Sequence, residues 1–188
     1  RFVAPFMALY SSAALAVTVS VPLQQPTATF SQSFTGDYSV ARAINGTTAD
    51  DRGWAIAPGP STSIPAQTAA FETVNNVGFV GGSLLTFTLT QNHTNLGHLL
   101  GRFRLSVTTD DRSLFCDGLA NGGDVTANWT VLSPTSVTAL NTTSFTVLGD
   151  QSILAGGTNP GTDLYTVVAA TFLTGITGVR LEALEDPS

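Results

Sequence analysis

Hydrophobic and polar residues alternate along much of the chain, in short runs separated by turn-forming residues. In the segment 81–91, Leu85, Phe87 and Leu89 alternate with threonines. Successive side chains of a β-strand point to opposite faces, so this alternation is typical of a strand with one buried face. No window of ten residues or more shows the 3.6-residue periodicity of an amphipathic helix.

The same reading predicts a series of short strands along the chain. They are expected at 17–23, 28–34, 39–44, 53–58, 67–74, 81–91, 101–111, 128–134, 143–149, 151–157, 163–171 and 177–186. Clusters of Gly, Pro, Asn, Asp and Ser separate these segments, and the Gly-rich segment 118–128 is the longest expected loop. Many short strands joined by such turns predict an all-β domain, an antiparallel β-sandwich or jelly roll.

The strand expected at 101–111 carries two of the seven positive charges of the chain, which are all arginines. Phe103, Leu105 and Val107 share one face, and Arg102 and Arg104 lie on the other. Opposite charges that face each other across antiparallel strands stabilise a sheet by about 0.2–1 kcal/mol. We therefore expect a charge ladder on the outer face of the sheet, and a patch that grips acidic glycans is the alternative. The ladder partners are expected among Glu72, Glu182 and Glu185, with Arg180 nearby.

The first sixteen residues form an apolar segment that admits two interpretations. A positive first residue, an apolar middle and the ending Ala14-Leu15-Ala16 are typical of a secretory signal peptide cut before Val17. Alternatively, residues 1–16 are retained and act as a donor strand that adds to a neighbouring subunit. Both interpretations predict a secreted or cell-surface protein in which residues 17–188 form a single domain.

The composition narrows the range of partners. Charged residues make up 11% of the chain, against roughly 25% in an average soluble protein, so the surface must be rich in Thr, Ser, Asn and Gly. The net charge of -6 argues against binding to nucleic acid or to anionic lipid. No apolar run reaches the roughly 18 residues that a membrane helix needs. The single cysteine, Cys116, is expected to be a buried small residue rather than a reactive thiol.

Several segments together resemble discoidin domains, also called coagulation-factor type C or galactose-binding-like domains. They are "YSVARAINGTTADDRGWAIAP", "GRFRLSVTTDD", "NWTVLSP" and "GITGVRLEAL". The resemblance covers about 26–188 and is strongest to the discoidin-like module of bacterial exported proteins, including planctomycete surface proteins and PEP-CTERM proteins. It implies a jelly roll that binds glycans or lipids or serves a structural role. One departure is Asn45, which stands where the family has an aspartate.

The chain has few residues suited to catalysis. Its only histidines are His93 and His98, and it has neither a lysine nor a G-x-S-x-G motif. Two histidines also fall short of the three or four ligands of a zinc site. We therefore expect a non-catalytic protein, whose two histidines lie in a polar loop and face solvent.

Four residues are candidates for ligand binding. The resemblance implies that Asn92 and His93 hydrogen-bond sugar hydroxyls if their loop lies at the sugar-binding end of the sandwich. Tyr38 and Phe79 are expected to be exposed aromatic residues, because they lie beside Gly-rich turns. Trp54 and Trp129 lie within apolar strand patterns and are expected in the core rather than as platforms for sugar stacking.

The loop "INGTTADD" is the best candidate for a metal site. Asn45, Asp50 and Asp51 supply the oxygen ligands that Ca²⁺ prefers, and the resemblance implies that Glu182 or Glu185 completes a structural calcium site. The alternative is that these side chains only build the turn. N-x-T sequons at Asn45, Asn92, Asn128 and Asn141 are candidate glycosylation sites in an exported protein.

The sequence thus predicts an exported β-sandwich that recognises surface or matrix glycans through its end loops. The alternative is a structural subunit of an extracellular filament or surface layer, which assembles by donation of the N-terminal strand.

Overall fold

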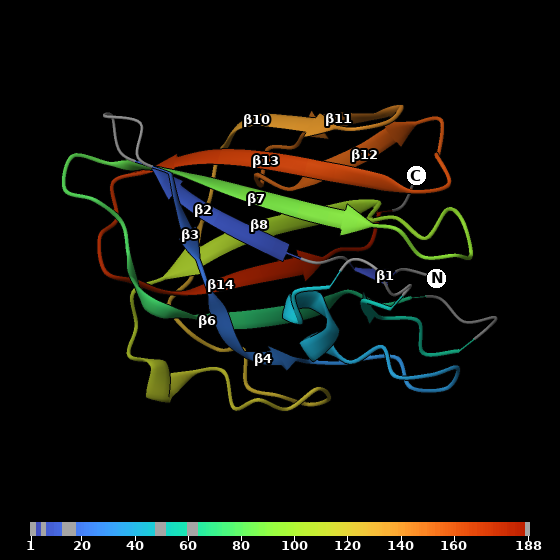
Figure 1. Ribbon diagram of the computed structural model, residues 1–188, viewed down its shortest axis with the longest axis horizontal. Helices are drawn as coiled ribbons and strands as arrows, with labels where there is room; N and C mark the ends of the chain where they lie inside the picture. Colours follow the sequence, from blue (N-terminus) through green and yellow to red (C-terminus); the bar gives the residue numbers. More distant parts are fainter. Residues whose placement is uncertain (1–2, 5–6, 13–17, 48–51, 60–63, 187–188) are drawn as a thin grey trace.

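The computed structural model describes residues 3–4, 7–12, 18–47, 52–59 and 64–186. These residues form two antiparallel sheets that pack face to face, accompanied by two short 3₁₀ helices (Figure 1). The prediction of an all-β antiparallel sandwich is therefore confirmed.

The first sheet has five strands in the order β10-β13-β7-β2-β3. Their bounds are β2 (Met7–Ser12), β3 (Thr18–Val21), β7 (Ser83–Gln91), β10 (Pro134–Ala139) and β13 (Asp163–Thr171). The two strands β7 and β13 pair along their whole length. They are the two longest strands of this sheet.

The second sheet has seven strands, in the order β11-β12-β8-β14-β6-β4 with β9 beside β8. Their bounds are β4 (Leu23–Ala28), β6 (Gln67–Val77), β8 (Arg102–Thr108), β9 (Thr130–Val131), β11 (Thr143–Val147), β12 (Ile153–Gly157) and β14 (Ile176–Ala183). A separate pair of two-residue strands, β1 (Val3–Ala4) and β5 (Trp54–Ala55), lies at one end.

The chain crosses from one sheet to the other at both sides of the sandwich. At one side, β3 belongs to the first sheet and β4 to the second, and only Pro22 separates them. Proline cannot donate a ladder hydrogen bond, so it suits a corner where pairing changes partner. At the other side, β10 pairs with β13 and β11 pairs with β12. Continuous chain therefore joins the layers at both sides.

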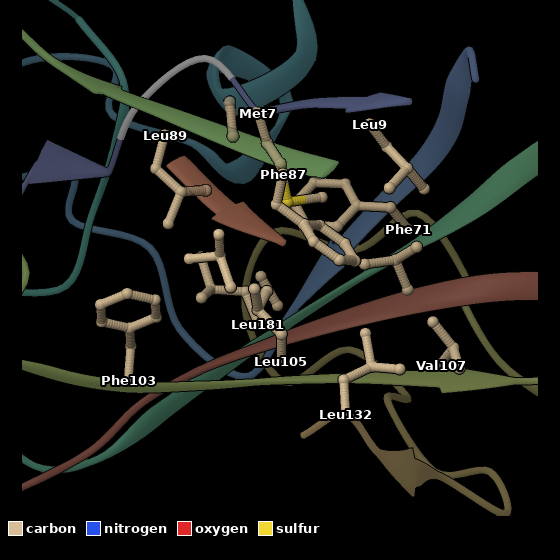
Figure 2. Close-up of a cluster of buried hydrophobic side chains, with 14 of the residues drawn as sticks. Met7, Leu9, Phe71, Phe87, Leu89, Phe103, Leu105, Val107, Leu132 and Leu181 are labelled. Atoms are coloured by element: carbon tan, nitrogen blue, oxygen red, sulfur yellow. The ribbon is translucent and has the colours of Figure 1, made fainter. Parts of the chain in front are cut away.

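The core lies between the two sheets (Figure 2). The inward faces predicted for β7 and β8 are confirmed, because each of their six apolar residues is at most 3% exposed. These residues are Leu85, Phe87, Leu89, Phe103, Leu105 and Val107. The strand β2 contributes Met7 and Leu9 to the same cluster. Full burial of one such side chain contributes about 1.5–3 kcal/mol.

Two of the predicted strands do not form. Residues 39–44 were expected as a strand, but η1 (Val40–Ile44) is a 3₁₀ helix that buries Val40 and Ala43. These two residues are three positions apart, which places them on one side of a 3₁₀ turn. The expected strand at 28–34 is also wrong, because β4 ends at Ala28. Beyond it the backbone bonds to two different elements, through the carbonyls of Thr68 and Ala55.

The loop 109–129 covers part of the outer face of the second sheet. It includes the short helix η2 (Arg112–Leu114) and places the Phe115 ring on Gly178 of β14. A Cβ atom at Gly178 would lie 2.5 Å from that ring, so a glycine is needed for this contact. As predicted, Cys116 is buried in the same cluster, and burial raises the pKa of its thiol to about 12. The thiol therefore stays protonated at neutral pH.

The two tryptophans have different surroundings. Trp54 is fully buried and donates its indole N–H to the carbonyl of Phe30, as expected for a core residue. Trp129 is only half-buried and lies outside the main core, so the prediction that it is a core residue is wrong. It meets Phe115 edge to face, with 5.6 Å between ring centroids, and the Arg180 guanidinium lies 5.2 Å from its ring centroid. Leu132, three residues later, does lie in the main core, so only part of the apolar pattern around Trp129 marks a core strand.

The N-terminal segment contributes a strand to the sandwich. Residues Met7–Ser12 form β2, which pairs with β7 on one side and β3 on the other. Cleavage before Val17 would remove this strand and leave β7 without a neighbour on that side. Cleavage itself, and the domain boundary at residue 17, stay predictions.

We expect Leu9→Ala to lower the free energy of unfolding by about 3 kcal/mol, because it leaves a cavity between the sheets. Leu96→Ala, at a position that is 69% exposed, serves as the control and should change stability little. Urea unfolding of the full chain measures both values. Equal stability of the two variants would show that β2 does not contribute to the core.

Candidate functional site

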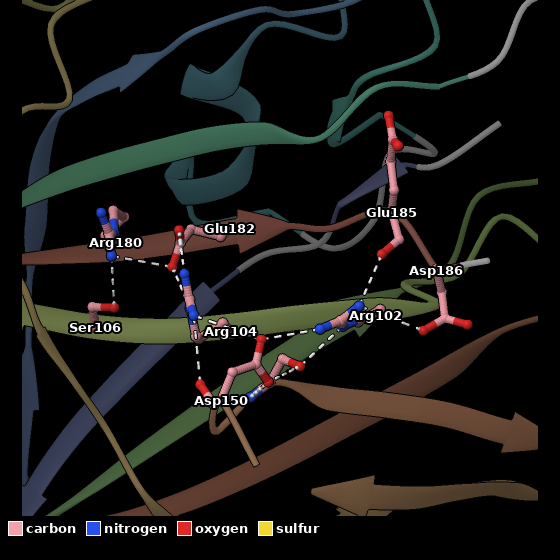
Figure 3. A network of polar contacts seen from close by, with 9 residues as sticks. Arg102, Arg104, Ser106, Asp150, Arg180, Glu182, Glu185 and Asp186 are labelled. Carbon is pink, nitrogen blue, oxygen red and sulfur yellow. Dashed lines mark hydrogen bonds and ion pairs between the residues drawn. The ribbon is translucent and has the colours of Figure 1, made fainter. Parts of the chain in front are cut away.

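The predicted charge ladder is present on the outer face of the second sheet (Figure 3). Arg104 of β8 stands opposite Glu182 of β14 in the register of the strands. Two parallel hydrogen bonds join them, from Nε to Oε2 at 2.8 Å and from Nη2 to Oε1 at 3.0 Å. These bonds raise the pKa of Arg104, since they favour its charged form.

Arg180 extends the ladder from the neighbouring position on β14. Its Nη2 lies 3.1 Å from Glu182 Oε2 and donates to the hydroxyl of Ser106 at 3.2 Å. Desolvation beneath Trp129 and the nearby charge of Arg104 lower the pKa of Arg180, although Glu182 opposes them. Glu182 thus pairs with two arginines that are each less than a quarter exposed, and Asp150 Oδ2 lies 3.7 Å from Arg104 Nη1 on the other side.

Arg102 forms the end of the ladder, where β8 begins. It donates from Nη2 to Asp150 Oδ2 and from Nε to the Ser152 hydroxyl, each at 3.0 Å. Its Nη1 donates to the backbone carbonyl of Glu185 at 3.2 Å and lies 3.7 Å from Asp186 Oδ2. Arg102 is therefore held on three sides.

Two details of the ladder differ from the prediction. Asp150 and Asp186, which lie in a turn and in the C-terminal segment, pair with Arg102 in place of the expected strand carboxylates. Glu72 accepts a hydrogen bond from Gln24 Nε2 at 2.9 Å instead. Hydrogen bonds from the hydroxyl and the backbone N–H of Ser152 lower the pKa of Asp150 to about 2, and the charge of Arg102 adds to this effect.

A cleft of about 410 Å³ opens beside Arg102, at the end of the sandwich. The β7–β8 loop, 92–101, and the C-terminal segment 184–186 meet there. Its lining combines charged groups with aliphatic side chains. The charged residues are Arg102, Glu185 and Asp186, and the aliphatic ones include Ile56, Leu99 and Leu184. We take this cleft as the candidate binding site.

The β7–β8 loop also contains a hydrogen-bonded cluster that joins two of the predicted ligand-binding residues. Tyr38 Oη lies 3.1 Å from His93 Nε2, although the two residues are far apart in sequence. His93 Nδ1 accepts the backbone N–H of Asn95 at 3.0 Å and lies 3.2 Å from His98 Nδ1. The expectation that the histidines face solvent is wrong for His93, which is 6% exposed. Its imidazole binds other parts of the protein and thereby orders the loop beside the cleft.

The remaining two predicted ligand-binding residues lie at opposite ends of the sandwich. Asn92 is exposed and directly precedes His93 at the cleft end. Phe79 lies in the β6–β7 hairpin, before β7 begins at Ser83. Phe79 and Tyr38 are half-buried, so the prediction that both are exposed is wrong. A strand of nine residues spans about 30 Å at 3.3 Å per residue, so β7 keeps Phe79 and Asn92 apart.

The predicted calcium ligands are only partly within the described residues. Asp50 and Asp51 lie outside them. Asn45 Oδ1 accepts the backbone N–H of Thr47 at 3.0 Å, which is the turn-building role considered as the alternative. Glu182 is held by Arg104 and Arg180 in the ladder. Among the described residues, no three or more His, Cys, Asp or Glu side chains converge as metal ligands. Calcium binding stays a prediction.

The four sequon asparagines are all exposed, as an acceptor of glycan must be. Two of them use the side-chain nitrogen that would carry the sugar. Asn128 Nδ2 donates to Asp110 Oδ2 at 3.0 Å, and Asn141 Nδ2 donates to the carbonyl of Thr162 at 2.7 Å. Asn45 and Asn92 complete the set, and glycosylation at all four stays a prediction.

Comparisons with known proteins do not assign this site. No family model, curated protein or solved structure matches the sequence. The resemblance to discoidin domains therefore stays a prediction.

We expect Glu182→Gln to lower the free energy of unfolding by about 2 kcal/mol, because it removes the carboxylate that pairs with Arg180 and leaves Arg104 with only the longer contact to Asp150, at 3.7 Å. Glu185→Gln makes the same chemical change three residues later, at an exposed position, and is the matched control. Thermal or urea unfolding compares the two. A Glu182→Gln protein as stable as the control would show that the ladder contributes nothing to stability.

Proposed function

We propose that the protein is a non-catalytic, exported β-sandwich that binds glycans in the cleft at its loop-bearing end. The observation that carries the proposal is the combination of Arg102, Glu185 and Asp186 with aliphatic side chains in one cleft of about 410 Å³. A sugar presents hydroxyl groups at its edges and apolar C–H groups on its faces. A few polar groups set into an apolar lining are typical of sites for small ligands.

The arrangement around Arg102 suits recognition of hydroxyl groups. The guanidinium is planar and carries five N–H donors in a fixed geometry. Its bonds to Asp150 and Ser152 hold that plane in place before any ligand arrives. A group already ordered loses little conformational entropy on binding, which favours affinity. Carboxylates at Glu185 and Asp186 accept hydrogen bonds from the same ligand.

Export is supported by the sequence rather than by the cleft. The charge-poor, Thr-rich composition and the apolar N-terminal segment both favour it. Among the described residues, no helix is long and apolar enough to cross a membrane. The partners expected for such a protein are glycans of a cell surface or an extracellular matrix.

Glycan binding can be tested on a broad glycan array, with and without calcium. Glu185→Ala and Asp186→Ala should each weaken binding of the recognised glycan by about tenfold, since each removes a charged hydrogen-bond acceptor. Asp124→Ala, in the loop on the outer face of the sheet, is the control and should bind as the unaltered chain does. Failure of the unaltered chain to bind any glycan in either condition would refute the proposal.

The position of β2 favours a second function, that of a structural subunit assembled by strand donation. This strand comes from the N-terminal segment, lies between β7 and β3, and buries Met7 and Leu9. A terminal strand that completes a sheet can be supplied by a neighbouring copy with the same pairing. Repetition of that exchange from copy to copy would build a filament.

Strand donation predicts that a chain lacking residues 1–12 binds a synthetic peptide of residues 1–17 in a one-to-one complex. The full chain should form polymers of increasing length, and the peptide should stop their growth by filling the acceptor site. A particle mass that stays constant with concentration and does not change on addition of the peptide would contradict this function.

A further inference from the structure

The end of the sandwich opposite the cleft exposes a set of apolar side chains. We call it the uncharged end and define it by the β6–β7 hairpin (78–82), the β13–β14 turn (172–175) and the segment 18–22. In Figure 1 the hairpin and the turn lie together at the left. Val80 at the tip of the hairpin is 98% exposed, and Phe172 in the turn is 86% exposed. Exposure this complete is unusual for an aromatic residue unless it meets a partner.

The segments that carry these exposed side chains are held by close contacts with each other. A Cβ atom at Gly82 would lie 3.3 Å from the Phe172 ring, so the hairpin and the turn touch. Gly78 has a φ of +110°, and its backbone packs against the Leu173 carbonyl too closely for any side chain. Within the hairpin, Phe79 donates its backbone N–H to the Ser83 hydroxyl at 2.8 Å. A surface ordered in advance loses little entropy when it binds.

A hollow of about 240 Å³ lies directly beside this projection. Its lining comes from 19–22 and 75–79, which join the sheet corner at Pro22 to the base of the hairpin. Val19, Val21, Val77 and Phe79 make it largely apolar, and Asn75 and Asn76 contribute polar groups. The uncharged end thus presents a projecting apolar tip and an apolar hollow next to each other.

The distribution of charge indicates which partner fits this surface. The segments 18–23, 74–84 and 168–177 contain no charged residue, whereas the whole chain has a net charge of -6. Two copies of an acidic protein repel each other through most faces. In a two-fold interface each group on the axis meets its own copy, so a surface without charge is the one that avoids repulsion.

We propose that two copies of this chain associate through their uncharged ends about a two-fold axis. The Val80 tip of each copy enters the apolar hollow of the other, and Phe172 is covered by the contact. A projection and a hollow on one surface are self-complementary under this symmetry, which is the requirement of an isologous interface. Only three short segments make up the surface, so the dimer is expected to be weak.

The dimer has a consequence for binding at the opposite end. It places the two clefts at the far ends of a double-length particle, facing away from each other. Such a particle can bridge two ligand-bearing surfaces, or engage one flexible polymer twice and gain avidity. This consequence rests on the proposed glycan function, but the dimer does not, because none of its residues lines the cleft.

Sedimentation equilibrium of the full chain between about 1 and 500 µM tests the dimer in the range expected of a small interface. We expect a reversible monomer–dimer equilibrium whose dissociation constant rises at least about tenfold in Val80→Asp and in Phe172→Asp, since each buries a charge at the contact. Leu96→Asp places the same charge on an apolar residue that is 69% exposed on the β7–β8 loop. It is the matched control and should dimerise as the unaltered chain does.

Three outcomes would overturn the proposal. The first is an unaltered chain that remains monomeric over the whole concentration range. The second is a dimer that is unaffected by both Val80→Asp and Phe172→Asp, or is equally weakened by Leu96→Asp. The third is growth into polymers rather than dimers, which would support strand donation instead. Thermal unfolding of each variant confirms that the exposed substitutions leave the fold intact.

Discussion

The side-chain alternation of β8 is the constraint on which the rest of the structure depends. One strand of seven residues gives Phe103, Leu105 and Val107 to the core and Arg102 and Arg104 to the ladder. A slip of one residue in its pairing with β14 would bury guanidinium groups between the sheets and expose the aromatic core. Core packing and charge pairing therefore specify the same register. A change of register would therefore disrupt both the core and the ion pairs.

This register also gives the molecule two unlike ends. The ladder terminates at Arg102, whose bonds to Asp150 and Ser152 bring charged groups to the cleft. At the other end the β6–β7 hairpin and the β13–β14 turn hold glycines and apolar residues and no charge. The long paired strands β7 and β13 separate the two ends. A small sandwich with so few charges can in this way reserve one end for polar ligands and the other for apolar contact.

Local alternation in the sequence was enough to predict strands with one buried face, including β7 and β8. It also predicted a ladder for Arg104, with Glu182 as one of three candidate partners. The strand prediction failed at η1. Its buried residues are three positions apart, which is the spacing of a 3₁₀ helix and not that of a strand. The strand β10 was not expected, because none of its residues is fully buried and they lack a strong apolar face. The contact between Tyr38 and His93 and the pairing of Asp150 with Arg102 depend on how loops from distant segments meet. No local pattern encodes such a meeting, although the Asp-x-Ser spacing at 150–152 does signal a turn.

Both chain termini of the described fold lead to the cleft end. The strand β1 pairs with β5, which directly precedes the cleft residue Ile56, and the C-terminal segment 184–186 lines the cleft itself. Immobilisation of the protein through a tag at either terminus would therefore orient the cleft towards the support and hide it from large ligands. The hairpin at 78–82 would then point into the solution. An attachment point on a central exposed position of the first sheet would leave both ends accessible.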